Sequence, residues 1–153
     1  MHKGLQVEDK LPLFAGKDQN GNEFNIASVL GEKVLVIYFY PKDDTPGCTK
    51  QACFFRDQYE EFKDLGAEVI GISGDSISAH KKFVHKYDLP FILLSDNDKT
   101  IRKLFGVPTN FLGLIPGRVT YIVDKKGIVK MVYDSMNAES HFPKVIEAVK
   151  SLV

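Results

Sequence analysis

The residues of this chain best suited to chemistry are its two cysteines, Cys48 and Cys53. They follow a run of seven apolar residues, 34–40, and a turn rich in Pro, Asp and Gly. An apolar run stopped by turn residues predicts a buried strand, and the helical periodicity after the turn predicts that Cys48 begins a helix. Free amides and the positive end of the helix dipole favour an anion there. Cys48 is therefore placed where a thiol readily becomes a thiolate, which is the reactive form.

The charged residues around this turn act in both directions. Asp43 and Asp44 precede Cys48 and oppose a thiolate, so another group must outweigh them. Arg118 is the best candidate, because it follows a Pro-Gly turn and enters an apolar strand, although this position also suits a surface arginine. Thr45 offers a hydroxyl that donates and accepts hydrogen bonds, or serves as an ordinary turn residue. Two cations nearer in sequence are expected to be solvated: Lys50 and Arg56.

Two other interpretations of the cysteines stay open from the residues alone. Free cysteine is often a small buried hydrophobe, which suits Cys53 better than Cys48. With His80 and His85 the pair superficially matches a two-Cys, two-His zinc site. However, 26 residues (54–79) separate the two halves, and histidines five apart on a helix point about 140° away from each other. We therefore predict no metal site, and exposed positions for all four histidines: His2, His80, His85 and His141.

Length and composition restrict the class of protein. The 153 residues suit one domain with a sizeable core, so a single domain is expected over 1–153. Lys plus Arg balances Asp plus Glu, 20 against 20, which argues against a nucleic-acid partner. No apolar run is long enough to span a membrane, and residues 1–4 lack the apolar stretch of a signal peptide. Two cysteines do not make a disulfide scaffold, so a reducing, cytoplasmic compartment is expected.

Apolar periodicity and turn signals divide the chain into alternating strands and helices. Turn residues predict two hairpins, one around 18–22 and one around 125–127. Strands are predicted at 11–15, 23–25, 34–40, 69–73, 91–95, 119–124 and 128–134, and helices at 48–65, 78–87, 98–105 and 140–152. This order predicts an α/β fold with a mixed central sheet, helices on both faces and an N-terminal hairpin extension. The arrangement resembles the thioredoxin-like fold.

The cysteine segment resembles a known active-site signature. Pro41-x-x-x-Thr45-x-x-Cys48 is similar to the motif of the peroxiredoxins, and its continuation through Gln51 and Cys53 resembles their Q-type group, also called bacterioferritin comigratory proteins. Three further strings are similar to that family: Gly71-Ile72-Ser73, Leu93-Leu94-Ser95-Asp96 and Arg118-Val119-Thr120-Tyr121-Ile122-Val123-Asp124. The resemblance covers nearly the whole chain.

The resemblance implies a hydroperoxide reductase that needs no metal, haem or flavin. Cys48 would be the peroxidatic nucleophile, whose thiolate attacks the peroxide and becomes a sulfenic acid. Arg118 would stabilise the thiolate and the charge on the departing oxygen. Thr45 would hydrogen-bond the thiolate and the peroxide and align them. Pro41 and Gly47 would line the substrate pocket with Thr45 and Arg118.

The same resemblance implies how the enzyme returns to its reduced state. Cys53 would resolve the sulfenic acid by forming a disulfide with Cys48, and a thioredoxin-like dithiol protein would reduce that disulfide by exchange. Because resolution occurs within one chain, a monomer is implied. A thioredoxin-like disulfide reductase is the alternative enzyme, but it usually needs C-x-x-C, whereas this chain has C-x-x-x-x-C. A non-catalytic zinc or interaction module is the third class.

Such a disulfide is incompatible with an intact helix start. Residues five apart on a regular helix have Cα atoms roughly 8–9 Å apart, whereas a disulfide needs them within about 7 Å. Oxidation is therefore predicted to unwind the first turn. Apolar residues on one face hold the remainder of this helix in the core: Ala52, Phe55, Tyr59 and Phe62.

Overall fold

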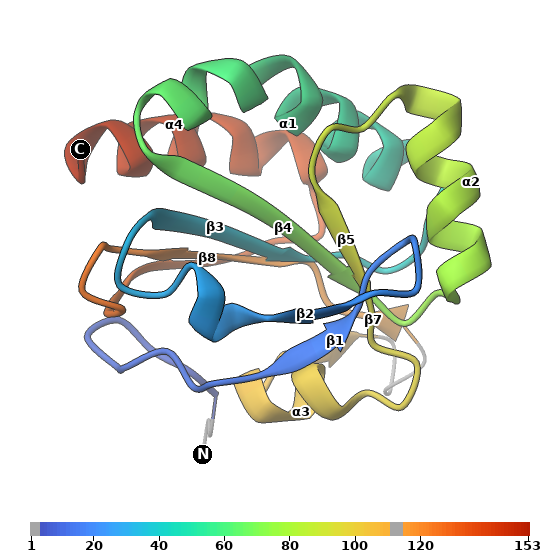
Figure 1. The fold of residues 1–153 in the computed structure, drawn as a ribbon, viewed down its shortest axis with the longest axis horizontal. Coiled ribbons are helices and arrows are strands. Elements are labelled where there is room, and N and C mark those ends of the chain that lie inside the picture. The colour runs from blue at the N-terminus through green and yellow to red at the C-terminus, as the bar shows by residue number, and fades with distance from the viewer. Residues whose placement is uncertain (1–3, 111–114) are drawn as a thin grey trace.

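A seven-stranded mixed sheet forms the centre of the computed structural model, which describes residues 4–110 and 115–153 (Figure 1). The strands lie in the order β2-β1-β5-β4-β3-β8-β9. β3, β4 and β5 run parallel to one another, and the other neighbouring pairs are antiparallel. Their bounds are β1 Ala15–Lys17, β2 Glu23–Asn25, β3 Val34–Phe39, β4 Ala67–Ser73, β5 Ile92–Ser95, β8 Val119–Val123 and β9 Val129–Asp134.

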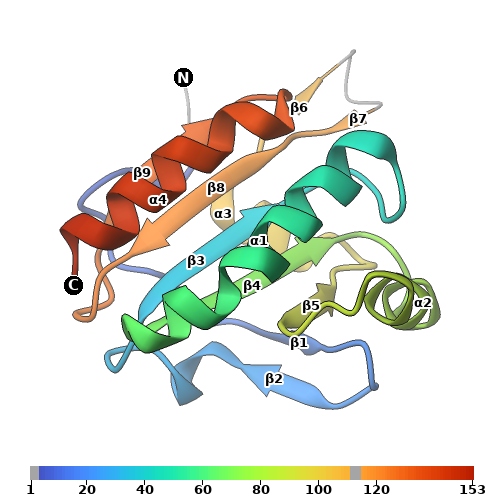
Figure 2. The same cartoon turned by 90° about the horizontal axis from the view of Figure 1, so that it is seen from above.

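Helices cover both faces of this sheet, as predicted. α1 and α4 lie side by side over one face, whereas α3 lies beneath the other (Figures 1 and 2). α2 packs beside β5 and contributes to the same core as α1 and α4. The helices are α1 Pro46–Asp64, α2 Ile77–Tyr87, α3 Thr100–Phe105 and α4 His141–Ser151, with short 3-10 turns η1 Ile26–Ser28 and η2 Ala138–Ser140.

The apolar run that predicted the first buried strand forms β3, which lies between β4 and β8. Successive side chains of a strand point to opposite faces. Val36 and Tyr38 therefore face the core beneath α1 and α4, whereas Ile37 and Phe39 face the core that contains α3. A strand with a core on both sides must be apolar at every position, which explains the absence of polar alternation.

The first strand lies later than predicted. Of the predicted residues 11–15, only Ala15 belongs to it, and β1 pairs with β2 through Ala15–Lys17, opposite Glu23–Asn25. The turn explains the shift, because Asp18 Oδ1 accepts hydrogen bonds from the amides of Asn20 and Asn22 at 2.8 and 3.0 Å. Pairing therefore begins directly before Asp18. The earlier apolar residues serve the core without belonging to a strand: Leu11 and Phe14.

A two-stranded ribbon was not predicted. It pairs β6 Thr109–Asn110 with β7 Ile115–Pro116 and leads directly to the turn before β8. The other predicted elements are present with ends that coincide with the prediction or differ from it by at most two residues, including the hairpin of β8 and β9.

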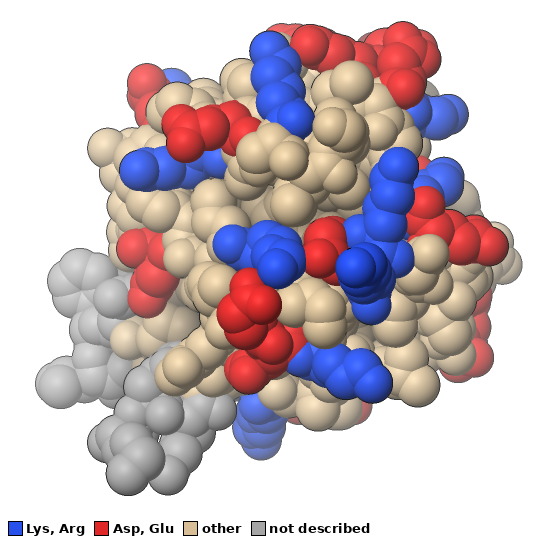
Figure 3. Space-filling view, turned by 90° about the vertical axis from the view of Figure 1, so that its left-hand side faces the viewer, with Lys and Arg blue, Asp and Glu red and all other residues tan. Residues whose placement is uncertain are grey.

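The described part of the chain contains no helix with the length and apolarity needed to cross a membrane. On the face shown in Figure 3, basic and acidic side chains are interspersed. That face offers no broad basic surface of the kind that binds nucleic acid.

Candidate active site

Cys48 lies in the first turn of α1, just after the loop that leaves the carboxyl end of β3. Thr45 is the residue before the helix, and Pro46 begins it. Proline suits this position because it lacks an amide hydrogen that the helix would leave unpaired. The helix therefore starts two residues earlier than predicted, yet Cys48 still belongs to the turn whose amides have no partner within the helix. Its side chain is buried.

Arg118 lies directly before β8, and its guanidinium group contacts the cysteine. Nη2 donates to Cys48 Sγ at 3.4 Å, Nη1 donates to Gln51 Oε1 at 2.8 Å, and Nε donates to the carbonyl oxygen of Met136 at 3.1 Å. Because β8 pairs antiparallel with β3, the residue before β8 lies at the end of β3 from which α1 begins. The arginine is 5% exposed, so the alternative of a surface position is wrong.

Gly47 allows this close approach. A Cβ atom on residue 47 would lie 3.0 Å from Arg118 Nη2, which is too short for unstrained contact, and 3.8 Å from the side chain of Ala138. A side chain at position 47 would therefore displace the guanidinium group from the sulfur. The residue contributes space, rather than a chemical group.

Thr45 and Pro41 border the same loop, and both are half-buried. The Thr45 hydroxyl donates to the carbonyl oxygen of Lys42 at 2.9 Å, and the carbonyl oxygen of Thr45 accepts from the amide of Thr49 at 2.8 Å. Among the described residues, no hydrogen bond joins this hydroxyl to Cys48. The structure thus brings Thr45 close to the site through its place in the chain, with its hydroxyl stabilising the turn.

The two acidic residues before the cysteine both have partners. Asp44 is exposed and accepts hydrogen bonds from Lys86 Nζ at 2.8 Å and the Tyr87 hydroxyl at 2.9 Å. The bond from Lys86, followed by that from Tyr87, lowers the pKa of the Asp44 carboxyl. Asp43 is buried: its Oδ1 accepts from the Tyr40 hydroxyl at 2.6 Å, and its Oδ2 lies 2.6 Å from His80 Nδ1.

The prediction that the histidines are exposed is wrong for His80 and His141, which are both fully buried. His80 reaches Asp43 with one ring nitrogen, and its Nε2 lies 3.0 Å from the carbonyl oxygen of Leu94 in β5. His141 Nδ1 lies 2.9 Å from Thr120 Oγ1, and Nε2 lies 2.7 Å from the carbonyl oxygen of Ser135. Buried polar groups need such partners, and these come from distant parts of the chain. His85 is exposed, as predicted, and His2 lies outside the described residues.

Burial is the main cause that lowers the pKa of His141, and the charge of Arg118 lowers it further. The hydrogen bond to the carbonyl oxygen of Ser135 acts in the opposite direction. The ring is therefore neutral at neutral pH, with Nε2 donating to Ser135 and Nδ1 accepting from Thr120.

Sequence reasoning missed two groups that hold the arginine. Gln51 is fully buried, and only its place in the motif drew notice. The carbonyl oxygen of Met136, in the connection between β9 and η2, carried no signal in the sequence because any residue supplies a carbonyl. Gln51 Nε2 and the Tyr38 hydroxyl are buried without hydrogen-bond partners among the described residues. Burial, followed by the charges of Cys48 and Asp43, raises the pKa of Tyr38.

Cys53 lies five residues along α1 and is partly exposed, whereas Cys48 is buried. Both are free thiols. The helix is continuous through both positions, so they point to different sides of it.

Three residues approach the spacing of a metal site: Asp43, Asp75 and His80, whose ligand atoms lie within 4.8 Å of one another. Each is already used within the protein. Asp75 Oδ2 accepts from the amide of Asp43 at 2.8 Å and from the Ser73 hydroxyl at 2.7 Å. The donor and acceptor groups satisfy one another, so the cluster is a hydrogen-bond network.

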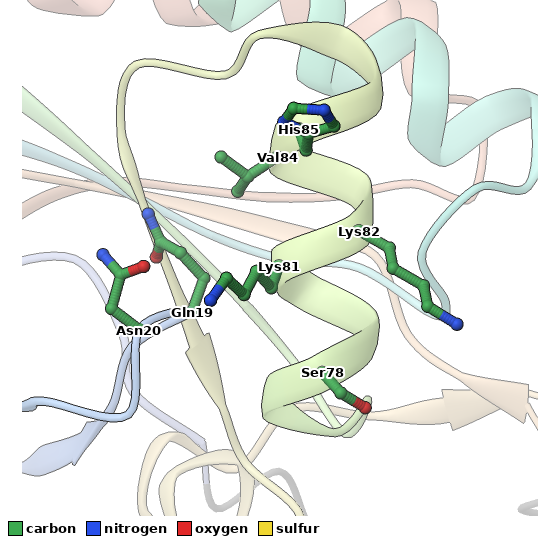
Figure 4. A pocket seen from close by; sticks show the side chains of 7 residues that line it. All are labelled: Gln19, Asn20, Ser78, Lys81, Lys82, Val84 and His85. Carbon is green, nitrogen blue, oxygen red and sulfur yellow. The ribbon is translucent and has the colours of Figure 1, made fainter.

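A surface hollow of about 520 Å³ lies between α2 and the turn that joins β1 to β2 (Figure 4). Gln19 and Asn20 face Lys81 across it, whereas Lys82 points away on the far side of the helix. Gln19 Oε1 accepts from the amide of Leu93 at 3.1 Å, which fixes the turn. The hollow contains neither cysteine, so it is separate from the candidate active site.

A buried cysteine at a strand-to-helix junction, held against a buried arginine on a thioredoxin-like sheet, is an arrangement suited to thiol-based redox chemistry. The family model described as AhpC/TSA family matches residues 7–132. This chain belongs to that family, within its peroxiredoxin Q group.

The chain is similar to the chloroplastic peroxiredoxin Q of Populus jackii, with 52% identity over 142 residues that cover 92% of this chain and 66% of that protein. It spans about two thirds of the length of several curated chloroplastic relatives that it matches, and 76% of the length of that of Sedum lineare. The crystal structure of peroxidoxin BcpB from Mycobacterium tuberculosis superposes with a TM-score of 0.89 at 32% identity, covering 97% of this chain and 99% of that one. Bacterioferritin comigratory protein of Xanthomonas campestris gives 0.83 at 30% identity, covering 94% and 98%.

Proposed function

We propose that this chain is a thiol peroxidase that reduces hydrogen peroxide and organic hydroperoxides. The contact between Cys48 Sγ and the buried guanidinium of Arg118 carries the proposal, because it provides a cation for a reactive thiolate. The Xanthomonas campestris relative is described by its alkyl peroxide reduction activity, which supports the substrate class. We further propose that the whole chain works as one domain.

In the first step the Cys48 thiolate attacks the terminal oxygen of the peroxide. A sulfur–oxygen bond forms while the oxygen–oxygen bond breaks, so sulfur is oxidised to a sulfenic acid and the peroxide is reduced. The leaving oxygen takes a proton and departs as water or an alcohol. Arg118 stabilises the thiolate and the charge on the leaving oxygen, and its three hydrogen bonds hold it in place before the substrate arrives.

The residues of the preceding loop complete the substrate site. Thr45 aligns the peroxide through its hydroxyl, whose oxygen is still able to accept while its hydrogen is donated to Lys42. Pro41 shields the sulfur from water, and Gly47 leaves the space in which the guanidinium and the substrate meet.

In the second step the thiolate of Cys53 attacks the sulfenic sulfur. A disulfide bond forms while the sulfur–oxygen bond breaks, and the hydroxide that leaves takes a proton and becomes water; the two cysteine sulfurs together thus supply the two electrons that reduced the peroxide. The first turn of α1 must unwind for this, since the sulfurs of residues five apart on a helix do not meet. A thioredoxin-like dithiol protein then reduces the disulfide by exchange.

We propose a monomer, because both cysteines lie in one chain. We propose a cytoplasmic, reducing compartment, because two cysteines do not make the disulfide scaffold of a secreted domain. The matched plant relatives are named as chloroplastic, so fractionation of the source cells with an antibody against the chain tests this compartment.

The test of function is peroxide consumption with thioredoxin as the electron donor. The unchanged protein should turn over repeatedly, Cys48→Ser should consume none, and Cys53→Ser should consume roughly one peroxide per chain and then stall. Reduction of insulin disulfides, measured in parallel, identifies a disulfide reductase. The proposal fails if Cys48→Ser keeps most of the turnover, or if insulin is reduced while peroxide is not.

A further inference from the structure

The buried pair of His80 and Asp43 contains a proton whose position is fixed by its neighbours. His80 Nε2 lies 3.0 Å from the carbonyl oxygen of Leu94, which only accepts, so Nε2 carries a hydrogen. Nδ1 lies 2.6 Å from Asp43 Oδ2, and two lone pairs would repel at that distance. A proton must therefore lie between them, and the pair as a whole is electrically neutral.

The groups around the pair favour an imidazolium beside a carboxylate. From the strand side, the Tyr40 hydroxyl donates to Asp43 Oδ1 at 2.6 Å, as it does to an ionised acid. From the loop after β4, the half-buried Asp75 places a second carboxylate within 4.8 Å of both His80 and Asp43. Two carboxylates so close together favour a cation between them, and the buried His80 ring contacts Asp43 directly. Lys42, Lys82 and Lys86 line the hollow beside the two acids, nearer the surface.

Asp43 shares its surroundings with the cysteine. It lies five residues before Cys48, and Tyr40, which donates to Asp43, stacks on Tyr38 with ring centroids 5.3 Å apart in the core that also holds Cys48. Burial is the main cause that raises the pKa of Tyr38; the charges of Cys48 and Asp43 raise it further, whereas Arg118 lowers it. An Asp43 carboxylate without His80 would therefore oppose the thiolate inside a buried region, where charges interact more strongly than in water.

We propose that His80 is a positioning residue for the reactive thiolate, because its imidazolium cancels the charge of Asp43 and fixes the loop that leads to Cys48. Arg118 then acts on the sulfur without an opposing buried charge. The inference rests on the proposed role of Cys48, and it gives α2 a part in the active site that the cysteine motif does not contain.

Titration of the Cys48 thiolate by its ultraviolet absorbance, in a Cys53→Ser background, tests this directly. His80→Gln removes the cation and leaves Asp43 charged, so the titration curve should move to higher pH by roughly one unit. Asp43→Asn should leave the curve unchanged. The amide of Asn would donate to a neutral His80, and this pair has the same total charge of zero as the imidazolium and carboxylate that it replaces. The double variant should titrate like the parent. His85→Gln, on an exposed position of the same helix, is the matched control.

A parent-like titration curve in the double variant would show that the effect of His80→Gln is due to charge. If His80 acted only as a structural anchor for the loop, removing Asp43 as well would not restore the curve. The proposal is overturned if His80→Gln leaves the curve in place, or if the double variant remains shifted. Melting curves of all variants identify any loss of the fold, and if His80→Gln alone is unstable, a shifted curve in Asp43→Asn or in the double variant still overturns the proposal. The titration needs no peroxide, so a protein that titrates as expected but consumes no peroxide refutes the peroxidase function and leaves this inference intact.

Discussion

Replacement of Arg118 by Met should slow the reaction of Cys48 with peroxide by about ten- to a thousandfold at neutral pH. Met keeps much of the apolar stem and removes the charge. The Nη2–Sγ distance is 3.4 Å, at which Coulomb's law with an effective dielectric constant of about 20 gives about 5 kcal/mol. Water entering the vacated space screens part of this. Opposite charges at such range typically change an ionisation by about 1–3 pH units, or about 1.4–4 kcal/mol, which gives the expected range.

The assay is single-turnover mixing with peroxide, and it must not rely on tryptophan fluorescence, because the chain has no Trp. Loss of thiolate absorbance reports the reaction instead. Rates measured at rising pH divide the loss of rate in Arg118→Met into two parts. The part caused by poorer ionisation of Cys48 disappears at a pH where the thiolate is fully formed, whereas the part caused by poorer stabilisation of the leaving oxygen remains.

Arg56→Met is the matched control for this change. Arg56 belongs to α1, the helix that carries both cysteines, and it donates to Asp57 and to the carbonyl oxygen of Tyr87, both at 3.0 Å. Its replacement should leave the rate within about threefold, as for a partly exposed ion pair. Equal rates for Arg118→Met and the unchanged protein would show that the guanidinium contact has no part in the reaction. Equal losses for both arginine variants would point to a general charge effect.

Four further results are expected. Gly47→Ala should lower the peroxide rate without unfolding the protein, because its Cβ would lie 3.0 Å from a guanidinium nitrogen; an unchanged rate would show that this contact relaxes freely. Tyr38→Phe removes a buried hydroxyl without a partner among the described residues, so urea unfolding should show equal or greater stability, by about 1–3 kcal/mol at most; a marked loss would reveal a hidden partner. The lowered pKa of His141 means that the unfolded chain binds more protons, so stability should fall as pH drops from about 6.5 toward the lower folded value, and His141→Asn should flatten this dependence in thermal melts. Oxidation should speed hydrogen exchange at 48–53 while 59–65 stays protected; equal protection of 48–53 in both redox states would point to a resolving partner outside the chain.

Strong local signals were sufficient to predict the elements that position the cysteine. The seven apolar residues of 34–40 specify a strand with a core on both faces, and the turn after them specifies where α1 begins. The role of Arg118 was predictable because two acidic residues precede Cys48, and a cation is needed to offset them if the thiol is to ionise. Its hydrogen bonds to Gln51 and to the carbonyl oxygen of Met136 were not predictable, because they depend on how β8, α1 and the segment before η2 meet.

The histidines show the limit of local pattern. His80 is followed by two lysines, and a helix with such neighbours reads as solvated. Its partner Asp43 is 37 residues away, and the carbonyl oxygen that fixes its other nitrogen belongs to β5. Burial of a polar residue depends on whether distant groups satisfy it, and a single sequence does not report that. The short ribbon of β6 and β7 was missed for another reason, because strands of two residues are too short to show a periodicity.

The two acids before the cysteine also limit which part of the chain moves when the disulfide forms. Asp43 is held by Tyr40, His80 and, through its amide, Asp75, and Asp44 is bound to α2 through Lys86 and Tyr87. The loop is therefore fixed on the near side of Thr45. On the far side, the buried rings of α1 resist movement from Phe55 onward, because leaving the core would cost about 3 kcal/mol or more for each ring. Between these limits the helix carries only one fully buried apolar side chain besides the cysteine, that of Ala52. The segment that unwinds to join the two sulfurs thus gives up little buried apolar surface, and its main cost is the loss of the hydrogen bonds from Arg118 to Cys48 and Gln51.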